Sequence, residues 1–304
     1  MKGLVQKSTG SWYTVLGEDS IVYKCRVRGK LRLEGIKETN PIAVGDYVEF
    51  QVEGEEGIIS TIYPRENYLV RQSVKKTGHS HVIAANLDQA LVVVTLAFPR
   101  TSLGFIDRFI IAAESFRIPQ IIVFNKCDLL TKEQEAEVEE LVLLYERLGV
   151  RCLVTSALDQ EQTAVRQLLQ GKKTLLAGHS GVGKSTLINK LSDSILQTTS
   201  EVSDFSSKGT HTTTFAEMFQ LDETTFIIDT PGIKELGLVD MEPEEISDYF
   251  VEMRALRADC KFGARCLHIN EPKCAVLEAV QKGIVAQSRY DSYVSIVKGE
   301  DNRK

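Results

Sequence analysis

Apolar and polar residues alternate with a strand-like period over the first part of the chain. Short runs of this kind, separated by glycine and polar turns, are typical of small β-barrels. We predict strands at Trp12–Leu16, Ile21–Val27, Leu31–Leu33, Tyr47–Val52 and Gly57–Ile62.

One segment of this region carries a basic residue at every second position around Gly29. Successive side chains of a strand point to opposite faces, so these residues share one face and their apolar neighbours the other. The basic residues are Lys24, Arg26, Arg28, Lys30 and Arg32. A small barrel with a basic face resembles an OB-fold that binds nucleic acid; the alternative is an ordinary solvated strand face.

The pattern changes after about residue 71. A polar and basic stretch, Gln72–His81, is expected to be a linker or loop. Beyond it, β-branched runs alternate with helical apolar spacing, which predicts a mainly parallel sheet with helices on both faces. Expected strands are Gln89–Leu96, Gln120–Phe124, Cys152–Thr155, Lys173–Ala177 and Thr225–Ile228. Expected helices are Leu103–Phe116, Thr131–Leu148 with a capping box at its start, Thr163–Gln170 and Thr186–Leu191.

The alternation of strands and helices stops after Gly232. Helical spacing continues at Pro243–Leu256, Ala275–Lys282 and Ile284–Val297. We therefore expect three domains: a barrel at 1–71, an α/β domain at 72–235 and a small helical domain at 236–304.

Composition agrees with a folded globular protein. The chain has 304 residues, of which 43% are hydrophobic and 26% charged. No apolar run suits a signal peptide or a membrane span, so we expect a cytoplasmic protein with no membrane partner. The net charge of −6 argues against a generic polyanion binder, although a local basic patch on one domain remains compatible with it.

A glycine-rich loop follows an expected strand and precedes an expected helix. Its GxxxxGK[ST] pattern lets backbone N–H groups surround phosphate oxygens at a helix N-terminus. Lys184 is expected to contact the β- and γ-phosphates as a catalytic group, and Ser185 to coordinate Mg²⁺. Nucleotide contacts are expected from Gly178, His179, Ser180, Gly181, Val182, Gly183, Lys184, Ser185 and Thr186.

An NKxD tetrapeptide, beginning at Asn125, ends another expected strand. The carboxylate of Asp128 can accept hydrogen bonds from guanine N1–H and the exocyclic amino group, two donors that adenine lacks at those positions. Asn125 is expected to brace the surrounding loops and the stem of Lys126 to cover the base. Further base contacts are expected from Ser156 and Ala157. Together these features favour GTP over ATP.

Two further elements suit magnesium and the γ-phosphate. Asp229 and Gly232 belong to a DxxG element, in which the aspartate acts on Mg²⁺ indirectly and the glycine N–H contacts the γ-phosphate. A threonine-rich loop precedes it at residues 209–214. Thr213 is the expected Mg²⁺ ligand, with Thr212 as the alternative.

The catalytic set lacks one residue. Ras-like enzymes place a water-orienting glutamine directly after DxxG, but this chain has Ile233 there, and an apolar side chain cannot orient water. We expect either that His211 takes this role or that a partner completes the site. The alternative for His211 is a simple partner contact.

Three cysteines and one histidine crowd into the C-terminal part. Cys260, Cys266, His268 and Cys274 offer three thiolates and an imidazole, which suit tetrahedral Zn²⁺. Four protein ligands leave no open position, so a structural zinc site is expected; clustered free thiols are the alternative.

The base-reading motif precedes the phosphate loop, the reverse of the order in most GTPases. This order, the barrel and the Cys/His segment together resemble the ribosome small-subunit-dependent GTPase A (RsgA) family of circularly permuted GTPases. The telling segments are VIAANLDQ from Val82, NKCD, GHSGVGKSTLIN, THTTT, DTPG and CLHINEPKCAV.

The resemblance implies a bacterial GTPase that binds the small ribosomal subunit and its rRNA, alongside other assembly factors, as a late maturation checkpoint. GTP or GDP, Mg²⁺ and one structural Zn²⁺ are the implied cofactors, hydrolysis is expected to drive release, and a monomer is expected. The main alternative is a non-catalytic scaffold whose RNA binding is gated by GTP. A GTPase serving metal insertion or RNA modification would need an exchangeable metal site or a modification domain, and the sequence indicates neither.

Overall fold

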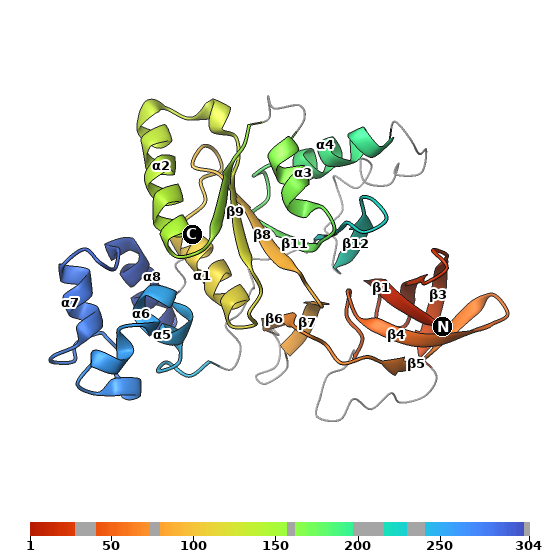
Figure 1. Ribbon diagram of the computed structural model, residues 1–304, viewed down its shortest axis with the longest axis horizontal. Helices are drawn as coiled ribbons and strands as arrows, with labels where there is room; N and C mark the ends of the chain where they lie inside the picture. The colour runs from red at the N-terminus through yellow and green to blue at the C-terminus, as the bar shows by residue number, and fades with distance from the viewer. Residues whose placement is uncertain (28–40, 73–79, 157–161, 197–215, 230–240, 301–304) are drawn as a thin grey trace.

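The computed structural model describes residues 1–27, 41–72, 80–156, 162–196, 216–229 and 241–300. Within this part of the chain, the barrel lies at one end, an α/β layer structure in the middle and a helical segment at the other end (Figure 1). One sheet of 11 strands runs from the α/β part into the barrel. None of the described helices is long and apolar enough to cross a bilayer.

The N-terminal region forms the expected five-stranded barrel. Within the barrel each strand hydrogen-bonds to two others, in the closed order β1-β2-β3-β5-β4-β1. Side chains that face inward, among them Val5, Val15 and Phe50, are fully buried. The strands are β1 Lys2–Ser8, β2 Tyr13–Gly17, β3 Val22–Val27, β4 Tyr47–Glu53 and β5 Glu56–Ile62.

The first strand was not expected from the pattern. β1 contains a register shift between Val5 and Lys7 where it pairs with β2, and this irregularity disrupts the alternation that identifies a strand. The expected strand Leu31–Leu33 lies outside the described residues.

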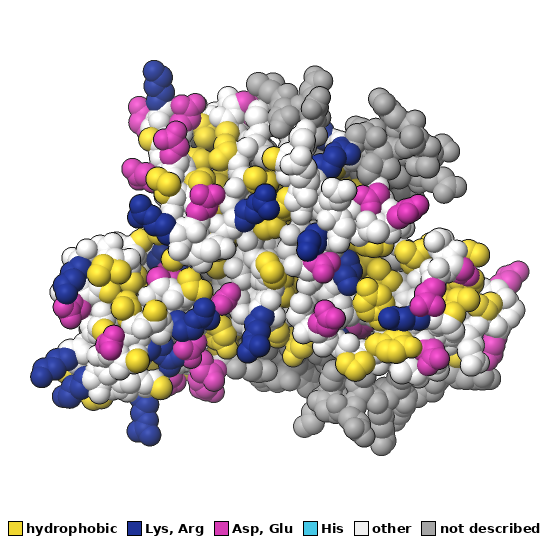
Figure 2. Space-filling view, viewed as in Figure 1, with side chains coloured by type: hydrophobic (Ala, Val, Ile, Leu, Met, Phe, Trp, Pro, Cys, Tyr) yellow, Lys and Arg dark blue, Asp and Glu magenta, His cyan; other side chains and the backbone are white. Residues whose placement is uncertain are grey.

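The basic face is only partly described. Lys24 and Arg26 point outward from β3 and Cys25 inward, as predicted. Arg26 pairs with Glu56 at 3.0 Å, and the Lys24 ammonium lies 4.2 Å from the Trp12 ring centroid. On the face shown in Figure 2, acidic and basic side chains are mixed over the barrel. The other three basic residues of this face lie outside the described part of the chain.

The middle of the chain forms the expected α/β layers. Its strands take the order β10-β9-β8-β11-β13-β12 and are parallel except for β12. The strands are β8 Gln89–Val94, β9 Gln120–Phe124, β10 Arg151–Val154, β11 Lys173–Ala177, β12 Glu217–Gln220 and β13 Phe226–Asp229. The helices are α1 Leu103–Glu114, α2 Lys132–Arg147, α3 Thr163–Leu169 and α4 Lys184–Leu196.

Alternate residues of each strand pack into two separate cores. Val92 and Val94 of β8 contact the core beneath α1 and α2, whereas Leu91 and Val93 contact the core beneath α3 and α4. The capping box of α2 forms as predicted between Thr131 and Gln134. A continuous apolar strand buried on both faces is typical of a parallel sheet covered by helices.

Two features of the connections differ from expectation. The stretch expected as a linker, Gln72–His81, starts in one strand and ends in another. These two strands, β6 Tyr68–Gln72 and β7 Ser80–Ala85, pair antiparallel. β12 was not predicted, and it pairs antiparallel with β1 through Lys7 and Glu217, whose side chains also form a 2.8 Å ion pair. This pairing joins the barrel to the α/β sheet.

The helix expected at Pro243–Leu256 is broken. Phe250 adopts an extended backbone (φ −90°, ψ 97°) between two short helices, which lets its fully buried ring pack edge-on against Tyr293. The C-terminal helices are α5 Ile246–Tyr249, α6 Val251–Arg254, α7 Ala275–Gln281 and α8 Gln287–Val297, with 3₁₀ turns at Arg257–Asp259 and Gly263–Arg265.

A buried ion cluster attaches the C-terminal segment to α1. Arg289 of α8 donates to Asp107 of α1 at 2.7 Å and to Glu252 of α6 at 2.7 Å, and the Tyr145 hydroxyl donates to Asp107 at 2.9 Å. Burial alone would lower the pKa of Arg289, but the two carboxylates outweigh it and raise that pKa. The guanidinium also lies 4.5 Å from the Phe250 ring centroid.

Replacing Arg289 with Met should loosen this attachment. The change leaves two carboxylates without their buried partner, which costs about 3–5 kcal/mol. We expect hydrogen exchange of the α8 amides under native conditions to accelerate accordingly. As a control, Lys282→Met removes a cation that pairs with Glu278 on the surface and should leave the α8 exchange rates unchanged; equal rates in the two variants would contradict the assigned role of the cluster.

Candidate nucleotide site and metal centre

The predicted nucleotide motifs converge on one edge of the sheet. The NKxD residues follow β9, Thr155 and Ser156 follow β10, and the glycine-rich loop follows β11. These three strands are parallel, so their carboxyl ends share one edge, where ligands of open α/β sheets bind.

Asn125 connects the two loops that approach from either side. Its side-chain amide donates to the Val182 carbonyl of the glycine-rich loop at 2.9 Å, while the Thr155 hydroxyl donates to its oxygen at 3.0 Å. Asn125 is buried, so both contacts are shielded from water and hold their geometry. Asn125 therefore links the glycine-rich loop to the residue that follows β10.

Two glycines make the phosphate loop possible. Gly183 has φ +102°, and a Cβ there would lie 2.4 Å from the Asn125 amide nitrogen. Gly178 has φ +139°, and a Cβ would lie 2.4 Å from the Val93 carbonyl oxygen. Both the left-handed backbone and the close approach exclude other residues.

Lys184 lies within this loop at the start of α4. Its ammonium donates to the carbonyls of Gly178 at 2.7 Å and His179 at 2.9 Å. Burial lowers the pKa of Lys184, and the nearby Asp229 carboxylate opposes this shift. Ser185, the expected Mg²⁺ ligand, lies in the first turn of α4 and is exposed. Phosphate charge would stabilise the ammonium further.

The expected base-reading residues lie together. The Ser156 hydroxyl donates to Asp128 Oδ1 at 2.7 Å, which links the NKxD loop to the end of β10. Lys126 has a left-handed backbone (φ +63°), and its ammonium donates to the Phe98 carbonyl at 3.0 Å.

The structure adds one residue that the sequence did not indicate. The Phe105 ring of α1 packs against the His179 ring of the phosphate loop, with centroids 4.0 Å apart and the ring planes tilted by 34°. In the sequence, Phe105 has only the signature of a helix core position. Ala157, His211, Thr212, Thr213 and Gly232 lie outside the described residues.

The Cys/His residues form a buried cluster. The four ligand atoms of Cys260, Cys266, His268 and Cys274 lie within 4.8 Å of one another. The sulfurs of Cys260 and Cys274 are 3.8 Å apart, and His268 Nδ1 lies 3.5 and 3.3 Å from them. A tetrahedral ion with Zn–S bonds of about 2.3 Å requires sulfur separations near 3.8 Å. The cluster therefore fits Zn²⁺.

The surroundings of the cluster hold its loop in place. The hydroxyls of Tyr290 and Tyr293 on α8 donate to the carbonyls of His268 and Leu267, and the Glu271 carboxylate accepts three backbone N–H groups of the loop. Burial raises the pKa of the Cys266 and Cys274 thiols. Without a cation the neutral thiols are favoured, whereas a divalent ion makes the thiolate form preferable.

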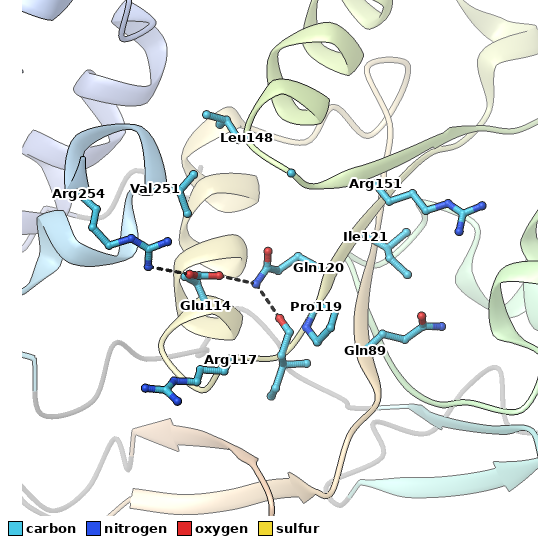
Figure 3. Close-up of a pocket in the computed structure, with 12 residues that line it drawn as sticks. Gln89, Glu114, Arg117, Pro119, Gln120, Ile121, Leu148, Arg151, Val251 and Arg254 are labelled. Carbon is cyan, nitrogen blue, oxygen red and sulfur yellow. Dashed lines mark hydrogen bonds and ion pairs between the residues drawn. The ribbon is translucent and has the colours of Figure 1, made fainter. Parts of the chain in front are cut away.

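A hollow of about 520 Å³ lies at the opposite edge of the sheet, away from all these residues. Figure 3 shows Arg254 of α6 reaching Glu114 of α1 at 3.1 Å across one side of it. Gln120 of β9 donates to the same carboxylate at 3.2 Å. These contacts add a second, exposed link between the C-terminal segment and the sheet.

Known proteins match this chain over its whole length. Residues 2–59 match the model described as RsgA N-terminal domain, and residues 62–239 the one described as RsgA GTPase. A curated relative from Christiangramia forsetii, named small ribosomal subunit biogenesis GTPase RsgA, is 48% identical over 99% of this chain and 97% of its own. The protein of the same name from Cytophaga hutchinsonii is 49% identical over the full length of both.

Two solved structures share the fold. YjeQ from Thermotoga maritima is 34% identical, with a TM-score of 0.77 over 100% of this chain and 99% of its own. YloQ, described as a circularly permuted GTPase, is 32% identical, with a TM-score of 0.74 over 100% and 96%. The expected fold class is thereby confirmed.

Substituting Gly183 tests the phosphate loop. We expect Gly183→Ala to weaken GDP and GTP binding at least about tenfold, because the new Cβ displaces Asn125 and strains the loop. Gly149→Ala is the matched control, since Gly149 also has a positive φ (+83°) but no atom lies within 4 Å of an added Cβ. Equal affinities of the two variants for GDP and GTP, measured by equilibrium titration, would contradict the assignment of this loop as the phosphate-binding site.

Removing a ligand tests the metal centre. The purified protein should contain one zinc ion per chain by elemental analysis, and Cys274→Ser should lose it. The loss should accelerate hydrogen exchange in α7 and α8, because α7 begins directly after Cys274 and α8 contacts the same loop through Tyr290 and Tyr293. Cys25→Ser, a buried barrel cysteine, should keep the zinc; retention of zinc by the Cys274 variant would be the contrary result.

Proposed function

The chain belongs to the RsgA GTPase family, and from this membership we propose that it acts on the small ribosomal subunit as a late maturation checkpoint. It is a GTP-hydrolysing enzyme with a circularly permuted fold. In our proposal it binds subunit rRNA alongside other assembly factors, works as a cytoplasmic monomer, and leaves the subunit after hydrolysis.

The observation that carries the proposal is the double contact of Asn125. It holds the phosphate loop to the segment after β10, so phosphate and base are recognised by one connected unit. We assign guanine to Asp128, Ser156 and Ala157, because the Asp128 carboxylate can meet two guanine donors that adenine lacks.

The phosphate end uses a different set of groups. Lys184 would neutralise the β- and γ-phosphates, and Gly232 would donate to the γ-phosphate. Mg²⁺, held by Ser185 and Thr213, supplies charge stabilisation when bound. His211 is our candidate for orienting the water.

The junction between β1 and β12 supports a link from hydrolysis to release. β12 begins directly after the segment that contains His211 and Thr213, and it pairs with the first strand of the barrel. A change around the γ-phosphate therefore has a short path to the barrel, which is covalent as far as β12 and continues through the β1–β12 pairing. We place the domain borders at 71/72 and 235/236; the first falls before the last residue of β6 and the second between β13 and α5.

Turnover on the small subunit tests the function and its main alternative. We expect purified subunits to raise single-turnover GTP hydrolysis at least about tenfold, and His211→Ala to remove most of that stimulation while GTP affinity is retained. His81→Ala is the control: it also removes a histidine, and the stimulation by subunits should remain. A scaffold gated by GTP would instead remain on the subunit with uncleaved GTP, and an unchanged rate in the His211 variant would exclude this histidine.

A further inference from the structure

An apolar groove of about 580 Å³ lies between α2 and β10, next to the NKxD loop. In Figure 2, hydrophobic side chains gather over this part of α2 and are edged by acidic ones. Two residues that line the groove are more than half exposed: Leu143 is 56% and Val154 is 55% exposed. The apolar lining consists of Cys127, Leu130, Val138, Val142, Leu143 and Val154.

The charged side chains that line the groove are acidic. Among its described lining residues, the charged ones are Glu135 and Glu139, four residues apart on α2 and both exposed. Two carboxylates beside an apolar floor repel nucleic acid phosphates and attract cationic side chains. The groove therefore suits a basic protein segment and disfavours RNA.

The strand beside the groove has an open edge. β10 pairs only with β9 among the described strands. The N–H and the carbonyl of Thr155 both bond toward the β9 side, so those of Val154, the preceding residue, point to the open edge. Val154 thus offers its side chain to the groove and its backbone to a partner strand.

We propose that this groove is the docking site for an extended, basic peptide segment of a partner protein, which adds a strand beside β10. Backbone hydrogen bonds to β10 hold such a segment, its apolar residues enter the groove, and its lysines or arginines meet Glu135 and Glu139. This inference does not depend on the ribosomal role. It does involve the nucleotide site, because Cys127 and Leu130 of the floor belong to the loop that follows Asn125.

Binding of a defined peptide tests the proposal. The probe is a fluorescent peptide in which lysine alternates with valine and leucine, compared with one carrying glutamate at the lysine positions. We expect the basic peptide alone to bind by anisotropy titration. Val154→Glu and the double variant Glu135→Lys with Glu139→Lys should each weaken it at least about tenfold. Both changes lie on exposed positions, so folding should be retained.

Two matched variants serve as controls. Glu140→Lys lies beside Glu139 on α2 but outside the groove, and Ile284→Glu replaces an apolar residue that is 69% exposed in the C-terminal segment. Both should bind the peptide like the wild-type protein. Equal binding of the two peptides, or equal loss in the groove and control variants, would overturn the proposal. Two further results would also overturn it. A dimer in sedimentation that Val154→Glu abolishes would make a second copy of this chain the occupant. Tighter peptide binding after deletion of residues 301–304 would make the C-terminal residues of the same chain the occupant.

Discussion

Arg289 occupies a position that few proteins give to a charged side chain. It is 1% exposed, and its guanidinium is shared by Asp107 and Glu252. These carboxylates belong to the α/β region and the C-terminal segment, so the pair can be satisfied only when the two pack together. Because an unpaired buried charge is costly, the cluster fixes their arrangement. α1 also carries Phe105, which packs against His179 of the phosphate loop, and α8 carries the tyrosines that contact the Cys/His loop.

The barrel is attached in another way. Its connection to the α/β sheet includes one β1–β12 residue pair, the Lys7–Glu217 ion pair and a hydrogen bond from Lys173 to Tyr47. The Lys7–Glu217 ion pair is partly exposed and therefore resists motion less than the buried Arg289 cluster does. A second, buried connection exists as well, because Leu4 and Val44 share a core with the α/β region and the Asn86 side chain donates to the Gly45 carbonyl at 2.9 Å. The buried Arg289 cluster thus lies on α1, the helix whose Phe105 contacts the phosphate loop, whereas the partly exposed β1–β12 contact lies at the strand that follows the threonine-rich loop.

Much of this arrangement was predictable because it rests on local pattern. The α/β strands are apolar runs between helical periods, and the motifs at their ends have fixed spacing, so the sequence places Asn125 and Lys184 on one edge of a parallel sheet. The Cys/His cluster follows from four ligand residues in one short segment.

Other features depend on contacts between distant residues. Asp107 and Arg289 are 182 positions apart, and each resembles an ordinary polar residue of an amphipathic helix. The break at Phe250 arises because tertiary packing of its ring outweighs helical spacing. β1 was hidden by its register shift, and β12 is only four residues long. The β6–β7 hairpin brackets a polar stretch whose composition resembles a linker.

The central claim is that the α/β region and the C-terminal segment form one body against which the barrel moves with nucleotide state. Pulsed electron paramagnetic resonance can measure this on the small subunit, with spin labels on noncanonical residues at the exposed positions Val52, Leu143 and Ile284. Between a GTP analogue and GDP, the Leu143–Ile284 distance should stay constant while the Val52–Leu143 distance changes. A constant Val52–Leu143 distance, or a change in the Leu143–Ile284 distance, would contradict the account.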